Sequence, residues 1–127
     1  DALLDVTNAA AACAALSGLQ DDSDALFARA AKTLNKGCPM SAQLAWEQIA
    51  RARHLSLAEV FRMEYAVSLN CCRNLEFPEG VRDLLIDKDN APRWSYSGVD
   101  VLPAATVAAH FTAPWPNNPL ADLEDRP

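Results

Sequence analysis

Apolar residues recur at helical spacing along most of the chain, and no stretch alternates apolar and polar residues between hairpin signals. The spacing predicts helices at about residues 8–16, 23–36, 39–54, 57–72, 77–87 and 103–111. The expected fold class is therefore all-α, a small bundle of five to six helices. The later prolines predict an irregular tail, so the chain divides into a helical domain at 1–111 and a Pro-rich tail at 112–127.

Residues that start and stop helices mark several of these boundaries. Thr7 is expected to cap the first helix, and Gly18 to end it in the left-handed conformation that other side chains resist. Gly37 is expected to end the second helix. Pro39 then falls in the first turn of the third helix, where proline is well tolerated.

The fourth helix has the strongest local signature in the chain. Ser56 and Glu59 form a capping box, in which each side chain bonds the backbone N–H of the other residue. Apolar residues then occupy most of the helix circumference, which predicts a central position in the bundle. The narrow polar face is expected to consist of Arg62, Ala66, Asn70 and Arg73.

Glu64 falls among the apolar positions of that helix, and two interpretations of it stay open. A buried carboxylate requires a charged or hydrogen-bonding partner, because burial of a lone charge is costly, and Arg82 is the partner we predict. The alternative places Glu64 at the edge of the helix, where its side chain reaches water.

The fifth helix and the tail lead to three further expectations. The helix is expected to bury Val81, Leu84 and Leu85. Gly80 in its first turn costs about 1 kcal/mol against alanine, which implies a packing or conformational reason for the glycine. In the tail, Trp115 is expected to lie in a surface groove.

Composition limits the classes of function. A chain of 127 residues, 50% of them hydrophobic, is sized for one compact domain. The net charge of -6, without a dense basic cluster, argues against nucleic-acid binding. No stretch approaches the roughly 20 apolar residues that cross a bilayer, so no membrane span is predicted. Asp1 and Asp5 precede the Ala-rich run at 9–15, which we interpret as a helix rather than a signal peptide, and a start at Asp1 is expected of a processed or truncated product.

The four cysteines show neither the paired spacing of a zinc site nor the density of a secreted disulfide scaffold. They are Cys13, Cys38, Cys71 and Cys72. We predict that they pack as small hydrophobic thiols and that the chain has no metal site. A reducing compartment is the favoured setting.

No arrangement of residues predicts a catalytic site. Neither His54 nor His110 lies in a recognisable catalytic motif, and the carboxylates are better explained as caps, first-turn charges and solvated faces. Lys88, Arg93 and Trp94 are the most interesting group, because a cation beside an exposed indole suits a phosphate or an adenine ring. The competing interpretation is a loop anchored by a buried Trp94.

The segment at 59–94 resembles the C-terminal signature of the 3-hydroxyisobutyryl-CoA hydrolases of the crotonase superfamily. The matching motifs are MEY at 63–65, Arg73, Phe77, EGVR at 79–82, IDKD at 86–89, Pro92 and Trp94. Further matches on either side are Asn35, Lys36, Pro39, His110 and Phe111. The order and spacing of so many matches argue against chance.

The resemblance implies the C-terminal helical region of a crotonase-type enzyme that hydrolyses a short branched 3-hydroxyacyl-CoA thioester in valine catabolism. In that family the oxyanion-hole amides and catalytic carboxylates belong to an N-terminal core that has no counterpart in this sequence. The chain alone is therefore expected to be inactive and to bind no cofactor of its own, with the N-terminal core as its partner and acyl-CoA as the substrate of the whole enzyme. The resemblance also implies that Lys88, with Trp94 as a second residue, contacts CoA, and that the protein resides in a bacterial cytoplasm or the mitochondrial matrix.

Two alternatives stay open beside this interpretation. The chain departs from the family pattern at Glu76, where aspartate is common, and at Asp83, where alanine is common. Enoyl-CoA hydratases and isomerases end in a related, shorter motif, so the C-terminal domain of such an enzyme is one alternative. The other is a stand-alone helical interaction module. A chain separated from its core is also expected to expose an apolar face and to self-associate.

Overall fold

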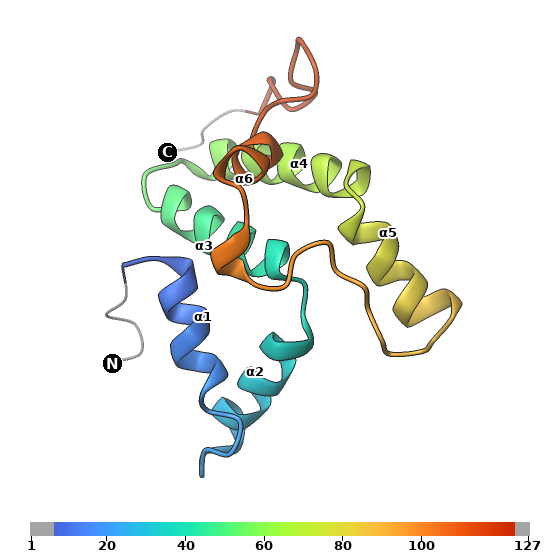
Figure 1. Cartoon of the computed structure of the whole chain (residues 1–127). Coiled ribbons are helices and arrows are strands. Elements are labelled where there is room, and N and C mark those ends of the chain that lie inside the picture. The colour runs from blue at the N-terminus through green and yellow to red at the C-terminus, as the bar shows by residue number, and fades with distance from the viewer. Residues whose placement is uncertain (1–6, 124–127) are drawn as a thin grey trace.

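The computed structural model describes residues 7–123, which form six α-helices (Figure 1). Their bounds are α1 Ala9–Ser17, α2 Ala25–Lys36, α3 Pro39–Ala52, α4 Leu57–Arg73, α5 Glu76–Val81 and α6 Ala104–His110. A π-helical segment, η2 at Arg82–Ile86, continues α5, and a 3-10 turn, η3 at Val99–Val101, precedes α6. No strand occurs in this range, so the all-α prediction is confirmed. Asp1, Asp5 and the end of the tail lie outside the described residues.

Helix termini agree with the sequence at α4 and differ at α1. The Ser56 side chain accepts a bond from the Glu59 N–H, and the Glu59 carboxylate accepts one from the Ser56 N–H, so the predicted capping box is present. Thr7 does not cap α1, because the Asn8 side chain accepts the first-turn N–H at 2.9 Å instead. Gly18 has a φ of -71° rather than the predicted left-handed conformation, because the chain continues into further tight turns.

The buried core lies where α3, α4 and α6 meet. Its members are Met40, Leu44, Val67 and Val107. Met40 and Leu44 are one turn apart on α3, so they share the face that packs against the other two helices. Removal of these side chains from water is the main force that joins the three helices.

α1 and α2 form a helical pair beside this core. They contact one another, and α1 also contacts α3. Ala9 of α1 and Ala31 of α2 are the buried residues of this pair. None of the described helices is both long enough and apolar enough to cross a membrane.

His110 belongs to the packed interior of the bundle. It is buried, with Nδ1 2.8 Å from the Thr106 carbonyl oxygen and Nε2 3.2 Å from the side-chain nitrogen of Asn74. A carbonyl oxygen only accepts and an amide NH₂ only donates, which assigns the ring proton to Nδ1. Both ring nitrogens are therefore used in structural hydrogen bonds.

Three of the four residues on the polar face of α4 lie against other parts of the chain, and the fourth, Arg73, is exposed. Ala66 is buried, and the Asn70 amide lies 2.8–3.2 Å from three carbonyl oxygens at the end of α6 and just beyond it. The Arg62 guanidinium donates to the Leu120 carbonyl at 3.0 Å and also to the Leu123 carbonyl. The polar face of this helix thus supplies donors that carbonyls at a helix end and in an irregular tail need.

A second face of α4 carries apolar side chains that stay exposed. Leu57, Phe61 and Tyr65 follow one another at intervals of one turn, and all three side chains are exposed. Trp115 of the tail packs on Tyr65, with their ring centroids 4.9 Å apart. Glu64 beside them is exposed, so the interpretation that places its carboxylate in water is confirmed.

α5 and η2 bury less apolar surface than the pattern predicts. Val81 is half-buried, but Leu84 is exposed and Leu85 is 68% exposed, so the prediction was wrong for both leucines. The Asp87 N–H bonds the Arg82 carbonyl at 2.8 Å, five residues back. Val81, Leu84 and Leu85 nevertheless border one hollow beside α5, and the leucines stay exposed because the described residues do not fill that hollow.

Candidate functional site

Two carboxylates attach the segment after η2 to α5. Glu79 Oε1 accepts the backbone N–H of Arg93 at 2.7 Å, and Glu76 Oε1 accepts the backbone N–H of Ser95 at 2.9 Å. Both acids lie in the first turn of α5, three residues apart, so their side chains share one face of the helix. The segment is therefore held at an amide on each side of Trp94.

Trp94 lies against α5 between these two attachments. Its indole Nε1–H donates to the carbonyl of Lys36, the last residue of α2, at 3.2 Å. A Cβ added at Gly80 would lie 3.5 Å from the indole ring, which is ordinary van der Waals contact. An alanine methyl group would therefore fit beside the indole, so this contact does not explain the choice of glycine over alanine. Trp94 links the end of α2 to α5 while part of its ring stays accessible.

Arg82 ties the polar loop after η2 back to α5. Its guanidinium donates to both carboxylate oxygens of Glu79, at 2.7 and 2.9 Å, in a bidentate pair. Nη1 of the same group donates to Asp87 at 2.7 Å and to Asp89 at 2.8 Å. Nη2 also reaches the Ala91 carbonyl at 3.3 Å. The predicted pairing of Arg82 with an acid of α4 was therefore wrong, because nearer acids of its own segment occupy all of its donors.

The acids around Arg82 differ in their affinity for protons. The Arg82 guanidinium, helped by backbone N–H donors, lowers the pKa of Glu79 to about 2 and that of Asp89 to about 2. Burial, and then the neighbouring Asp89, raise the pKa of Asp83. Within residues 7–123, Asp83 Oδ1 is buried without a hydrogen-bond partner. The loop conformation therefore rests on ionised Glu79 and Asp89.

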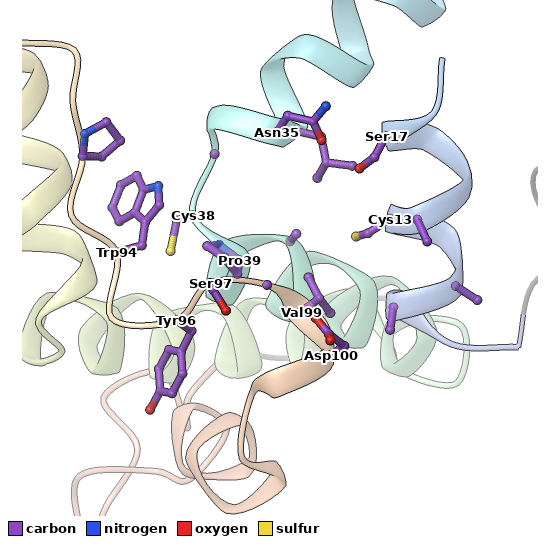
Figure 2. Close-up of a pocket in the computed structure, with 18 of the residues that line it drawn as sticks. Cys13, Ser17, Asn35, Cys38, Pro39, Trp94, Tyr96, Ser97, Val99 and Asp100 are labelled. Carbon is purple, nitrogen blue, oxygen red and sulfur yellow. The ribbon is translucent and has the colours of Figure 1, made fainter. Parts of the chain in front are cut away.

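Trp94 and Cys38 form part of the walls of two cavities. The larger cavity, of about 880 Å³, lies between α1, the α2–α3 junction and the loop at 92–100. Figure 2 shows Ser17 and Asn35 on one side of it and Trp94 with Cys38 on the other. Its volume lies in the range of small-molecule sites, and its lining mixes apolar and polar groups.

The smaller cavity, of about 440 Å³, lies between α3, α4 and α5 and is mainly apolar. Its apolar lining includes Met40, Leu44, Phe77, Val81, Leu84 and Leu85. The two exposed leucines of η2 thus border a hollow rather than a flat surface. An occupant of this cavity would have to be apolar, because the lining offers few hydrogen-bonding groups.

The four cysteines are free thiols, and three of them are partly buried, as predicted, whereas the predicted packing is wrong for Cys72, which is exposed. Burial raises the pKa of Cys13, Cys38 and Cys71, which keeps them protonated at neutral pH. The Cys38 S–H donates to Glu76 Oε2 at 3.4 Å. In the described part of the chain, no group of three or more His, Cys, Asp or Glu side chains could hold a metal ion.

The structure places the two predicted CoA-contacting residues in different settings. Trp94 lines both cavities, whereas Lys88 is exposed, has a φ of 55° and lines neither of them. Arg93, from the same predicted group, lines the larger cavity. The loop organised by Arg82 thus carries an exposed cation, while the indole is anchored a few residues later.

Two residues of this site were not identified from the sequence. Cys38 lines both cavities, and Glu76 binds both Cys38 and the Trp94 segment. A cysteine before a proline and an acid at a helix start are ordinary features, so neither carries a recognisable signal. They become neighbours only because α5 lies against the start of α3.

A family model described as enoyl-CoA hydratase/isomerase matches residues 1–111. The chain belongs to the enoyl-CoA hydratase/isomerase family. A relative from Danio rerio named 3-hydroxyisobutyryl-CoA hydrolase, mitochondrial, is 43% identical over 65% of this chain and 22% of its own length. The relative of the same name from Gallus gallus is 36% identical over 80% of this chain and 26% of its own length. The Homo sapiens relative of the same name is 33% identical, over 76% of this chain and 25% of its own. The chain thus spans about a quarter of the length of these curated relatives.

Solved structures of the enoyl-CoA hydratase/isomerase family resemble the fold. A carnitinyl-CoA dehydratase from Mycobacterium thermoresistibile matches with a TM-score of 0.78 at 25% identity, over 97% of this chain and 34% of the solved chain. An enoyl-CoA hydratase from Rhodobacter sphaeroides matches with a TM-score of 0.71 at 26% identity, over 85% and 32%. The predicted likeness to a helical region of a crotonase-type enzyme is confirmed.

The hydrogen bonds explain the motifs through which this enoyl-CoA hydratase/isomerase family member resembles its relatives. Glu79 and Arg82 of the EGVR motif bond one another, and Arg82 bonds Asp87 and Asp89 of the IDKD motif. Glu79 also holds the backbone next to Trp94. The motifs therefore specify one loop conformation and the position of one indole.

Proposed function

We propose that this chain is the non-catalytic C-terminal helical region of an acyl-CoA thioester hydrolase that acts on 3-hydroxyisobutyryl-CoA in valine catabolism. One observation carries the proposal: relatives with that name match 65–80% of this chain and only 22–26% of their own length. Thioester hydrolysis needs an activated water, a base and donors for the oxyanion. We assign these groups to an N-terminal crotonase core, which is the proposed partner of the chain.

Exposed apolar side chains support a partner of this kind. Leu57 and Phe61 on α4, and Leu85 and Ile86 on η2, are exposed although they lie in ordered helical segments. Large apolar side chains left exposed in a helical segment are typical of a contact with another structural unit. A crotonase core would cover it, and without that core the chain is expected to self-associate.

We place acyl-CoA against the Trp94 loop. Trp94 offers a partly accessible indole in the wall of the larger cavity, and Lys88 offers an exposed ammonium group on the preceding loop. An indole can stack on an adenine ring, and an ammonium group can meet a phosphate. Because the named relatives are mitochondrial, we propose the mitochondrial matrix as the location, with a bacterial cytoplasm as the alternative.

The proposal is tested with the intact source protein and with the 127-residue chain alone. Release of CoA from 3-hydroxyisobutyryl-CoA is followed with a thiol reagent, and the mass and reading frame of the source protein are determined. We expect turnover by a source protein that contains an upstream crotonase core, and none by the chain alone. Turnover by the chain alone, abolished by changing one of its own carboxylates, would overturn the proposal.

The CoA contact is tested separately in the intact source protein. Trp94→Leu is expected to raise KM roughly 5-fold to 150-fold, because a base stacked on an aromatic ring contributes about 1–3 kcal/mol. Lys88→Ala is expected to raise KM less, since an exposed charge pair is screened by salt. Trp46→Leu, a tryptophan of α3 outside both cavities described above, is the matched control. An unchanged KM in the Trp94 variant would remove that residue from the CoA site.

The family description and the hydratase likeness favour a second candidate, the C-terminal region of an enoyl-CoA hydratase or isomerase. A hydratase parent would add water across the double bond of a 2-enoyl-CoA, and an isomerase parent would shift that double bond; both would leave the thioester intact. Loss of the conjugated thioester absorbance of crotonyl-CoA, without release of free CoA, would favour this candidate. Thioester cleavage without hydration would favour the hydrolase.

A further inference from the structure

Glu76 is a carboxylate in an unfavourable setting. It is 7% exposed. In the described part of the chain its hydrogen-bond partners are the Ser95 N–H at 2.9 Å and the Cys38 S–H at 3.4 Å, and both donors are uncharged. A buried carboxylate without a cation costs free energy, and such local conflicts concentrate at functional sites. The Ser95 N–H and the Cys38 S–H, which bond to this carboxylate, therefore indicate which part of the structure Glu76 holds in place.

Of the two groups that Glu76 holds, Cys38 lines both cavities, and Ser95 adjoins Trp94, which also lines both. Glu79 fixes the chain on the other side of Trp94, through the Arg93 N–H. Loss of Glu76 would leave the Trp94 segment attached on one side only and would release the Cys38 thiol at the same time.

We propose that Glu76 is the positioning residue of the wall that Trp94 and Cys38 contribute to both cavities. It binds the Ser95 amide and the Cys38 thiol with its two oxygens, and it thereby fixes the Trp94 indole between the cavities and sets the affinity for acyl-CoA. The effect on affinity rests on the proposed function, whereas the effect on the position of Trp94 does not.

Three substitutions at Glu76 separate its two bonds. Glu76→Ala removes both acceptors. Glu76→Asp keeps the charge but is one methylene shorter, so it cannot span both the Ser95 amide and the Cys38 thiol. Glu76→Gln keeps the length and one acceptor oxygen, which can still receive the Ser95 N–H. The expected order of effects on the Trp94 segment is therefore Ala, then Asp, then Gln.

Hydrogen exchange by NMR on the 127-residue chain tests the positional effect. In Glu76→Ala we expect at least about tenfold faster exchange of the Ser95 amide and the Trp94 indole N–H, because both bonds lose their support. In Glu76→Gln we expect less than about threefold, a rescue by the conservative variant. The matched control is Glu47→Gln on α3, which removes a charge paired with Arg51 and leaves the segment untouched.

The Cys38 thiol provides a second readout. Burial and the bond to Glu76 both raise the pKa of Cys38, so Glu76→Gln should move its alkylation by iodoacetamide to lower pH. Mass spectrometry of the Cys38 peptide measures this shift, and the exposed Cys72 serves as an internal reference. A general loss of stability would change the alkylation of every cysteine, whereas the proposal predicts a shift for Cys38 alone.

The kinetic effect is measured in the intact source protein. Glu76→Ala should raise KM for acyl-CoA about 5-fold to 20-fold and change kcat by less than about twofold, because the residue acts through Trp94 and not on the reacting atoms. If Glu76→Ala does not fold, Ser95→Pro removes the same N–H donor and must produce the same changes in Trp94 exchange and KM.

Unchanged Ser95 and Trp94 exchange in a folded Glu76→Ala variant would overturn the positioning role. Faster exchange with an unchanged KM would overturn the link from this wall to acyl-CoA. A source protein that hydrolyses no acyl-CoA, in which exchange still accelerates, would contradict the proposed function and support the positioning role.

Discussion

Different forces hold the bundle of α3, α4 and α6 and the segment of α5 with η2. The bundle buries Met40, Leu44 and Val67 in one apolar core, so its stability is intrinsic to the chain. The α5 segment leaves Leu85 exposed and is shaped by the bonds of Arg82 and two glutamates. The comparison teaches that apolar burial holds the first region, whereas polar bonds shape the second and leave its apolar and aromatic side chains accessible.

The largest expected effect separates the two regions directly. Leu44→Ala should lower the free energy of unfolding by about 2–4 kcal/mol, because it leaves a cavity in the core where Leu44 is 4% exposed. The same change at Leu85 should cost less than about 0.5 kcal/mol, since most of that side chain already contacts water. Urea denaturation followed by circular dichroism measures both, and equal losses would contradict the division into two regions.

The next effect concerns the polar side of the bundle. Asn70→Ala should lower the free energy of unfolding by about 1–2 kcal/mol, because carbonyl oxygens at the end of α6 lose their donor. Arg73→Ala, an exposed polar position of the same helix, is the control and should have little effect. If the two variants unfold at the same urea concentration, α6 does not depend on the Asn70 amide.

A smaller effect, confined to acid, is expected in the α5 segment. Glu79 and Asp89 have pKa values of about 2 against ordinary values of 4.5 and 3.8, so their stabilising contribution is present above those ordinary values and is lost as the pH falls toward 2. Asp83, with its raised pKa, acts in the opposite direction. In Arg82→Met the pKa values of Glu79 and Asp89 should return toward their ordinary values.

Carboxyl-carbon NMR titration between pH 1 and pH 6 measures this change. Arg51→Met, which removes a guanidinium from another ion pair, is the control and should leave Glu79 and Asp89 unaffected. Low pKa values that persist without Arg82 would assign the loop conformation to the backbone N–H donors instead.

The smallest effect on stability should come from the exposed face of α4. Phe61→Glu should change the free energy of unfolding by less than about 0.5 kcal/mol, because the ring is 49% exposed. It should nevertheless reduce self-association, which light scattering measures across a concentration series. A wild-type chain that stays strictly monomeric at high concentration would count against the proposed contact between this face and a core.

The sequence predicted local features well where neighbouring residues decide them. The capping box of Ser56 and Glu59 and the start of α3 at Pro39 depend on contacts within one turn, and both are present. The burial of Leu84 and Leu85 was predicted wrongly, because the pattern shows which side of a helix is apolar and not whether another part of the chain covers it. For a related reason the pattern did not reveal that Arg62 and Asn70 of α4 donate to backbone carbonyls of the tail and of α6.

The candidate site was predictable only in part. Trp94 was identified through motif spacing, and it does line both cavities. Glu76 and Cys38 were not identified from the sequence, because they are 38 residues apart and become neighbours only when the helices pack. The predicted contact of Lys88 and Trp94 with CoA stays a prediction.

Periodicity, caps and motif spacing alone determined the helical class, the order of the helices and the family likeness, because each depends on neighbours along the chain or on a string of residue types. Only the tertiary structure decided which face of each helix is covered and that Arg82 bonds acids of its own segment. It also decided that the Glu76 carboxylate accepts the backbone N–H of Ser95, next to Trp94. Those outcomes depend on which donors and acceptors remain unsatisfied once the helices pack, and packing is a property of the whole chain.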